Sequence, residues 1–251
     1  MNVDLNSDSG ESFGSWTMGD DAAMAQIVSS LNVACGFHAG DPDVARVTCR
    51  AAADAGVAVG AHVAYPDLQG FGRRVMDMAH DELVNATIYQ IGALQAIARA
   101  SGTRVTYVKP HGALYNRIAR DAAQAAAVAE GIASVSTDLP ILVLPDSEIQ
   151  KAAQDAGLRA VPEVFADRGY NPDGSLVSRR EKGAVLHDAR EIADRVVRMV
   201  EEGLVTAVDG SDVRVSAESV CVHGDTPGAV DIARTIRRGL DDAGIEVQSF
   251  V

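Results

Sequence analysis

Four of the six histidines in this chain lie at the ends of apolar runs that read as buried β-strands. They are His38, His62, His111 and His223. Histidine beside carboxylates at such positions suits a divalent metal site or general acid–base catalysis. A single histidine at a strand end is more often structural, but four at equivalent positions favour a shared site. The sequence has no HExxH or other close ligand spacing, so a metal would need ligands from distant segments, and whether one binds stays open.

Polar side chains also alternate along the first apolar run, at Asp4, Asn6 and Asp8, and Glu11 follows. Because successive side chains of a strand point to opposite faces, these three side chains converge on one side. Asp8 and Glu11 could activate water or hold a cation there. A polar loop that caps the next helix is an alternative of equal weight.

Lys109 ends another apolar run, two residues before His111. A lysine at this position is costly to bury unless it meets an anion, such as a phosphate or a substrate carboxylate. The alternative is an ion pair with an internal Asp or Glu. The glycine-rich segment 70–74, which ends in two arginines, could add flexible cationic contacts. Any nucleotide site must use another architecture, because the chain has neither a Walker A nor a GxGxxG sequence.

The elements that would position these residues repeat as an apolar run, a polar loop and a helical pattern, which predicts a parallel α/β fold. The predicted strands are 2–6, 31–36, 57–63, 105–109, 140–144, 159–165 and 219–223, with a further short run at 246–250. About seven such units in 251 residues predict a single-domain (β/α) barrel over residues 1–251, similar to a TIM barrel. Barrel enzymes build their sites at the C-terminal strand ends, where the polar clusters lie.

Capping signals predict where the helices begin and end. Asp41-Pro42 opens a helix that Gly56 ends, and Thr226-Pro227 repeats this signal before a helix that Gly244 ends. Helical patterns also cover 80–101 and 188–202.

Composition excludes several classes of protein. The net charge of −13 would repel nucleic acid and an anionic membrane surface. The N-terminal residues show no signal-peptide pattern, and no run has the roughly 18 apolar residues of a membrane span. The three cysteines form neither a disulfide framework nor a zinc motif. We therefore expect a cytoplasmic protein with reduced cysteines, without nucleic-acid or membrane partners.

The motifs together resemble those of the LamB/YcsF family from one end of the chain to the other. They are DLNSDSGESFG (4–14), NVACGFHAGDP (32–42), GFGRR (70–74), VKPHGALYN (108–116), EVFADR (163–168) and VHGD (222–225). The chain departs from the family pattern in two segments: Ser7 stands where the family usually has cysteine, and Val63-Ala64 stands where Pro-Ser typically follows the histidine.

The resemblance implies a barrel related to those of glycoside hydrolases and polysaccharide deacetylases. It also implies ATP-dependent 5-oxoprolinase activity, in which 5-oxo-L-proline, ATP and water give L-glutamate, ADP and phosphate. ATP would be a co-substrate with Mg²⁺, and separate B and C subunits would be partners.

The resemblance further implies a set of site residues. The expected catalytic residues are Asp8, Glu11, His38, Lys109, His111, Glu163 and Asp167, and the expected substrate-binding residues are Asn6, His62, Arg168, His223 and Asp225. Lys109 would contact the anion, and His111 and His38 would transfer protons or polarise the substrate. The carboxylates would orient water, a cation or the ring nitrogen.

Two other functions stay open. One is a stand-alone metal-dependent amide or ester hydrolase, such as a carbohydrate deacetylase, that uses the same histidines and carboxylates. The other is a substrate-binding or scaffolding subunit whose catalysis takes place in a partner.

Overall fold

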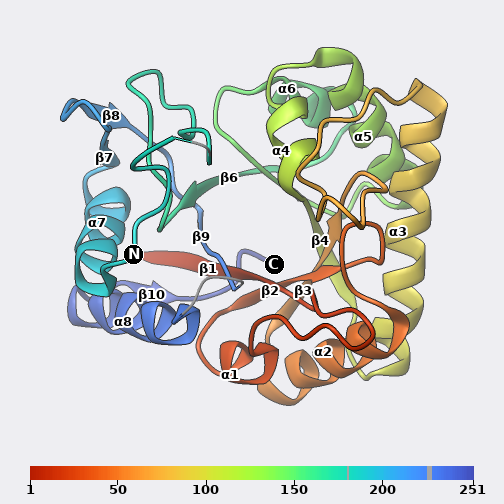
Figure 1. The fold of residues 1–251 in the computed structure, drawn as a ribbon, viewed down its shortest axis with the longest axis horizontal. Coiled ribbons are helices and arrows are strands. Elements are labelled where there is room, and N and C mark those ends of the chain that lie inside the picture. Colours follow the sequence, from red (N-terminus) through yellow and green to blue (C-terminus); the bar gives the residue numbers. More distant parts are fainter. Residues whose placement is uncertain (180, 225–227) are drawn as a thin grey trace.

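Seven parallel strands close into a barrel (Figure 1), in the computed structural model that describes residues 1–179, 181–224 and 228–251. The order around the ring is β1-β2-β3-β4-β5-β6-β9, and β9 pairs again with β1. The bounds are β1 Asn2–Ser9, β2 Ser30–Ala34, β3 Ala58–Val63, β4 Val105–Pro110, β5 Ile141–Val143, β6 Ala160–Phe165 and β9 Ser219–Val222. The predicted barrel of about seven units is confirmed.

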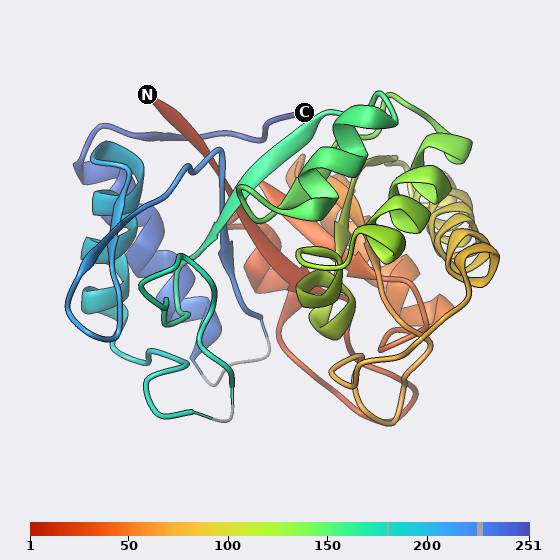
Figure 2. The same ribbon diagram turned by 90° about the horizontal axis from the view of Figure 1, so that it is seen from above.

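Helices cover the outside of the ring (Figures 1 and 2). In the described parts of the chain they are α1 Asp21–Ala25, α2 Pro42–Ala55, α3 His80–Ala100, α4 Gly112–Ile118, α5 Ala122–Val135, α6 Glu148–Asp155, α7 Ala189–Glu201 and α8 Ala229–Asp242. The predicted boundaries of α2 are confirmed: the Asp41 carboxylate accepts hydrogen bonds from two backbone N–H groups of the first turn, and Gly56 ends the helix at φ 69°.

Three short strands complete the fold. β10 (Glu246–Val247) pairs in parallel with the start of β1, as the run at 246–250 predicted. β7 (Leu204–Thr206) and β8 (Asp212–Arg214) form an antiparallel pair that the sequence analysis did not predict, because each has only three residues. The predicted helix start at Thr226-Pro227 lies outside the described residues.

The barrel interior has an apolar layer and a polar layer. Tyr107, Leu142 and Val161 point inward and pack with Phe250 near the C-terminus. Gly60 makes room for this layer, because a Cβ atom there would lie 2.2 Å from the Tyr107 ring. Further along the strands the inward side chains are polar, and these carry the candidate site. No helix among the described residues has both the length and the apolar character needed to cross a membrane.

Candidate active site

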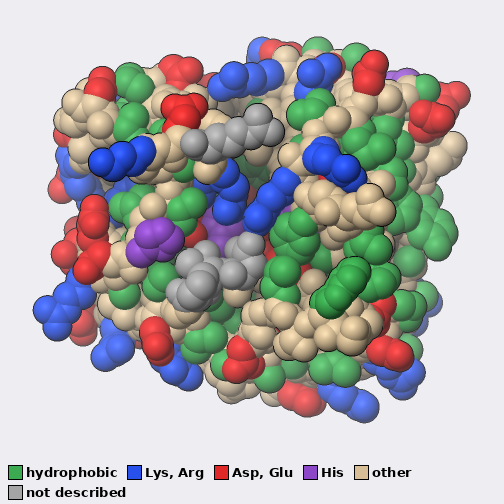
Figure 3. Space-filling model, in the orientation of Figure 1, with side chains coloured by type: hydrophobic (Ala, Val, Ile, Leu, Met, Phe, Trp, Pro, Cys, Tyr) green, Lys and Arg blue, Asp and Glu red, His purple; other side chains and the backbone are tan. Residues whose placement is uncertain are grey.

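A cavity of about 750 Å³ opens at the C-terminal ends of the barrel strands. Among the described residues, six basic and two acidic side chains line it: Arg73, Arg74, Lys109, Arg117, Arg168 and Arg179, against Asp8 and Glu11. Figure 3 shows histidine at the bottom of a hollow on this face, with basic side chains around it. The excess of positive charge is local, since the whole chain carries −13. The cavity therefore favours an anionic ligand.

Lys109 forms the centre of the cavity floor. Its Nζ lies 3.0 Å from Asp8 Oδ1, 3.1 Å from Glu163 Oε1, 2.9 Å from Cys221 Sγ and 3.0 Å from Asn6 Oδ1. Burial would lower the pKa of Lys109, but Asp8, Cys221 and Glu163 outweigh burial and hold that pKa well above its ordinary value. The geometry matches the internal ion pair that the sequence left as an alternative. A contact with a substrate anion stays a prediction, and it would require one of the four acceptors to be exchanged.

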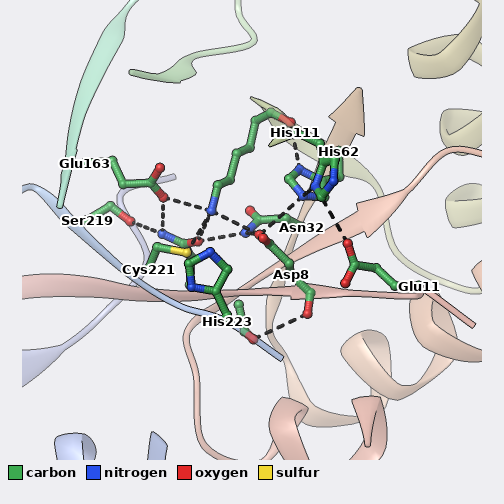
Figure 4. A network of polar contacts seen from close by, with 12 residues as sticks. Asp8, Glu11, Asn32, His62, His111, Glu163, Ser219, Cys221 and His223 are labelled. Atoms are coloured by element: carbon green, nitrogen blue, oxygen red, sulfur yellow. Dashed lines mark hydrogen bonds and ion pairs between the residues drawn. The ribbon is translucent and has the colours of Figure 1, made fainter. Parts of the chain in front are cut away.

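The floor also contains polar side chains that the sequence analysis did not single out, among them Asn32 and Ser219 (Figure 4). Asn32 Nδ2 donates to Asn6 Oδ1 at 2.7 Å and to Asp8 Oδ1 at 2.9 Å. Asn6 Nδ2 donates to Ser219 Oγ at 2.7 Å and to Glu163 Oε1 at 2.8 Å. Spacing offered a signal for Ser219. Ser219 and Cys221 precede His223 at intervals of two, so all three belong to the inward face of one strand.

Three histidines and a glutamate gather on the other side of Asp8, and Figure 4 shows Glu11, His62 and His111 of this group. Glu11 and His38 follow β1 and β2, His62 lies in β3, and His111 follows β4. His38 stacks on His111, with ring centroids 3.8 Å apart, and its Nε2 lies 3.2 Å from Glu11 Oε1. Burial and the neighbouring histidines hold the pKa values of both stacked rings well below the ordinary value. Both shifts disfavour the protonated form of the ring.

The loop after β3 holds one of these rings in place. Phe71 contributes its carbonyl oxygen, 2.9 Å from His111 Nε2. Arg73 lies over the Phe71 ring, with 4.8 Å between guanidinium carbon and ring centroid, and Arg74 Nε donates to Asp67 at 2.8 Å. Both arginines of the predicted 70–74 segment line the cavity.

His223 and Asp167 form a separate pair on the opposite wall. His223 Nδ1 lies 2.7 Å and 3.0 Å from the two Asp167 carboxylate oxygens. Burial would raise the pKa of Asp167, but His223 outweighs burial and the pKa is lowered. Because an ionised carboxylate only accepts hydrogen bonds, Nδ1 carries a proton, which makes Nε2 the proton acceptor of the neutral ring. His223 lines the cavity, so this nitrogen is available for proton transfer.

Not every predicted residue faces the cavity. Glu163 and Asn6 contact Lys109, His38 stacks on His111, and Asp167 contacts His223, but none of these four lines the cavity. Arg168 does line it, but its guanidinium donates to the carbonyl oxygens of Ala184 at 3.0 Å and Val177 at 2.6 Å. Its contact with substrate stays a prediction. Asp225 lies outside the described residues.

The model of the LamB/YcsF family matches residues 3–251. The chain belongs to the LamB/YcsF family.

Similar LamB/YcsF-type chains are known by sequence and by structure. Over 248 residues the chain is 62% identical to the 5-oxoprolinase A subunit of Kocuria rhizophila, with 99% of this chain and 98% of that protein covered. The crystal structure of the lactam utilization protein from Thermus thermophilus is 45% identical and has a TM-score of 0.95, with 100% of both chains covered. A polysaccharide deacetylase from Bacillus cereus is 12% identical, with a TM-score of 0.50 and with 100% of this chain and 92% of that chain covered, which shows a shared fold alone.

The residues that depart from the LamB/YcsF pattern, Ser7 and Val63-Ala64, do not line the cavity. Ser7 is buried on the face of β1 opposite Asp8, away from the cavity. At Val63 the backbone carbonyl accepts a hydrogen bond from the His111 N–H at 2.8 Å, a contact that does not involve the changed side chain. His62 keeps its place beside His111, at 2.9 Å.

Proposed function

We propose that this chain is the A subunit of an ATP-dependent 5-oxoprolinase, which hydrolyses 5-oxo-L-proline to L-glutamate. The observation that carries the proposal is the basic cavity with acid–base groups on its floor and wall, in a chain 62% identical to the A subunit of a 5-oxoprolinase. 5-Oxoproline carries a carboxylate, and ATP carries phosphates, so both co-substrates match the charge of the cavity. Mg²⁺ would accompany ATP, and B and C subunits would complete the enzyme.

The chemistry explains the need for ATP. A lactam carbonyl is a poor electrophile because attack removes amide resonance. Transfer of the γ-phosphoryl group to the lactam oxygen releases ADP and gives an activated imidate-like species. Water then adds at this carbon, and the C–N bond breaks as the ring nitrogen takes a proton, which leaves an acyl phosphate. A second water molecule hydrolyses this acyl phosphate, and phosphate leaves. The products are L-glutamate, ADP and phosphate.

The site supplies groups for these steps. His223 Nε2, oriented by Asp167, would accept the proton of the attacking water and return it to the ring nitrogen. The arginines of the cavity wall would bind the carboxylate and the phosphoryl oxygens. Asp8 and Lys109 on the floor would fix the lactam.

The test is glutamate release from 5-oxo-L-proline by the purified chain, with and without ATP-Mg²⁺ and with and without the B and C subunits. We expect turnover only when all components are present. Asp167→Asn should lower kcat by about 10²–10⁴-fold, because His223 loses its orienting carboxylate. Glu130→Gln is the matched control, since Glu130 forms the same kind of pair with His80 on the surface, at 3.0 Å. Absence of glutamate in every combination, or equal effects of the two variants, would contradict the proposal.

A metal-dependent amide or ester hydrolase is the second candidate. The buried cluster of Glu11 with three histidines favours it, because such groups are suitable metal ligands. Amide cleavage by the isolated chain without ATP would support this second function. Binding of 5-oxoproline without turnover in the complete complex would instead indicate a binding subunit.

A further inference from the structure

The carboxyl ends of four successive barrel strands bring four ligand atoms together. They belong to Glu11, His38, His62 and His111, all buried, and lie within 4.8 Å of one another. His38 Nε2 lies 3.2 Å from Glu11 Oε1, His111 Nδ1 lies 3.7 Å from the same oxygen, and His62 Nε2 lies 2.9 Å from His111 Nδ1.

Backbone carbonyls fix the protons on two of these rings. His62 Nδ1 lies 2.9 Å from the Lys109 carbonyl oxygen, and His111 Nε2 lies 2.9 Å from the Phe71 carbonyl oxygen. A carbonyl oxygen only accepts, so both of these outer nitrogens carry protons. In neutral rings the two inner nitrogens are then lone pairs, and they face each other at 2.9 Å.

Two facing lone pairs require a positive group between or beside them. A third proton would place a charge on the buried ring pair, whereas a metal cation binds neutral imidazole directly. Hydrogen bonds from the outer nitrogens to carbonyl oxygens are also the usual support of metal-bound histidine, because they set the tautomer and the ring orientation.

We propose that Glu11 Oε1, His38 Nε2, His62 Nε2 and His111 Nδ1 bind one divalent transition-metal ion, with Zn²⁺ as the best match. A tetrahedral zinc with bonds of about 2.0–2.1 Å separates its ligand atoms by about 3.3 Å. The three separations given above, from 2.9 to 3.7 Å, span this value. Three imidazoles and one carboxylate disfavour Ca²⁺ and Mg²⁺, which prefer oxygen ligands.

The ion would be accessible to a ligand. Glu11, His62 and His111 line the cavity, and Asp8 Oδ1 lies 3.4 Å from His62 Nε2. A carbonyl oxygen or a water molecule in the cavity would meet the ion as a fifth ligand, an expansion that zinc sites allow. The proposal concerns cation binding by the chain itself, and it holds whether or not 5-oxoproline is the substrate.

Metal analysis of the full chain tests the site. The purified chain is stripped with a chelator and titrated with Zn²⁺ by calorimetry, and bound metal is counted by mass spectrometry. We expect one equivalent per chain, and a visible absorption spectrum typical of a four-coordinate site when Co²⁺ replaces Zn²⁺. Glu11→Gln and His111→Ala should each raise the Zn²⁺ Kd by roughly 100-fold or more, since loss of even a supporting residue costs 10–100-fold.

The surface pair of His80 and Glu130 provides the control, because it also joins a histidine to a carboxylate at 3.0 Å. His80→Gln should bind Zn²⁺ as the unchanged chain does. Circular dichroism shows whether each variant is folded, and the ¹⁵N shifts of the histidines in the unchanged chain give a readout without substitution. Less than 0.1 equivalent of bound Zn²⁺ in the unchanged chain would overturn the proposal. So would unchanged affinity in both site variants, or zinc binding without a shift of the His62 and His111 nitrogens.

Discussion

The buried ammonium group of Lys109 faces two carboxylates, and this arrangement has consequences for stability. Asp8 and Glu163 both lie within 3.1 Å of Nζ, and none of the three side chains is more than 9% exposed. The ammonium of Lys109 and the carboxylates of Asp8 and Glu163 thus form one buried ionic group, in which each charge is compensated by its neighbours. Removal of one partner from such a group leaves an uncompensated buried charge. The free-energy cost of that charge is larger than the net stabilisation that the ion pair provides.

We therefore expect Lys109→Met to lower the free energy of unfolding by about 3–5 kcal/mol. Urea unfolding at pH 7 measures the change. Lys151→Met is the matched control, since Lys151 contacts Glu148 at 2.7 Å but is 65% exposed. This surface pair should contribute less than about 1 kcal/mol. Equal losses in the two variants would show that Lys109 is not stabilised by its buried partners.

Between β3 and α3, the loop carrying Phe71 and Gly72 shapes the histidine cluster. Gly72 has φ 64°, in the left-handed region, and its carbonyl oxygen accepts from the Ala113 N–H at 2.8 Å. A Cβ atom at this position would lie 2.7 Å from His111 Cδ2 and 2.8 Å from His38 Cβ. The glycine thus allows the loop to approach both rings closely.

Gly72→Ala should therefore lower kcat/KM for glutamate release by at least about tenfold, because a small displacement of site residues is costly to catalysis. Gly157→Ala is the control: Gly157 has φ 75°, and no atom lies within 4 Å of its added Cβ. Both variants should lose roughly 1–2 kcal/mol of stability from the left-handed backbone, and steady-state kinetics should separate them. A normal kcat/KM in Gly72→Ala would show that the rings tolerate the displacement.

The elements also show how far the sequence could predict the site. Alternation along the first strand predicted that Asp4, Asn6 and Asp8 share one inward face, and the hydrogen bonds of all three with side chains of the neighbouring strand confirm this placement. Which histidine meets which carboxylate could not be predicted. That pairing depends on loops such as the one at Phe71, whose φ of 53° no local pattern specifies. Asn32 was missed because a single polar residue in an apolar run has no periodic signal.

At the scale of the whole molecule, the acidic chain concentrates basic side chains around one cavity and polar side chains inside one barrel. One of these is Asp4, which accepts hydrogen bonds from Ser29 and Ser30 at 2.6 Å and from Ser219. Burial, with a contribution from the Glu163 charge, raises the pKa of Asp4 from 3.8 to about 6, although the three hydroxyl groups oppose the shift. The folded state therefore binds a proton at this site more tightly than the unfolded chain does.

The sign of the pH dependence follows from linkage. Below pH 4 Asp4 is protonated in the folded and in the unfolded state, so it does not change the free energy of unfolding. As the pH rises towards 6, Asp4 ionises first in the unfolded chain, and the free energy of unfolding decreases. Above pH 6 the cost is constant, on the order of 3 kcal/mol. Asp4→Asn should thus gain that amount relative to the unchanged chain between pH 4 and pH 7, measured by urea unfolding at each pH. Asp212→Asn should show the opposite trend, because hydrogen bonds from Arg198 lower the pKa of Asp212. A constant difference between Asp4→Asn and the unchanged chain over this range would mean that burial does not control Asp4, and that the serine hydroxyls hold its charge in the barrel without cost.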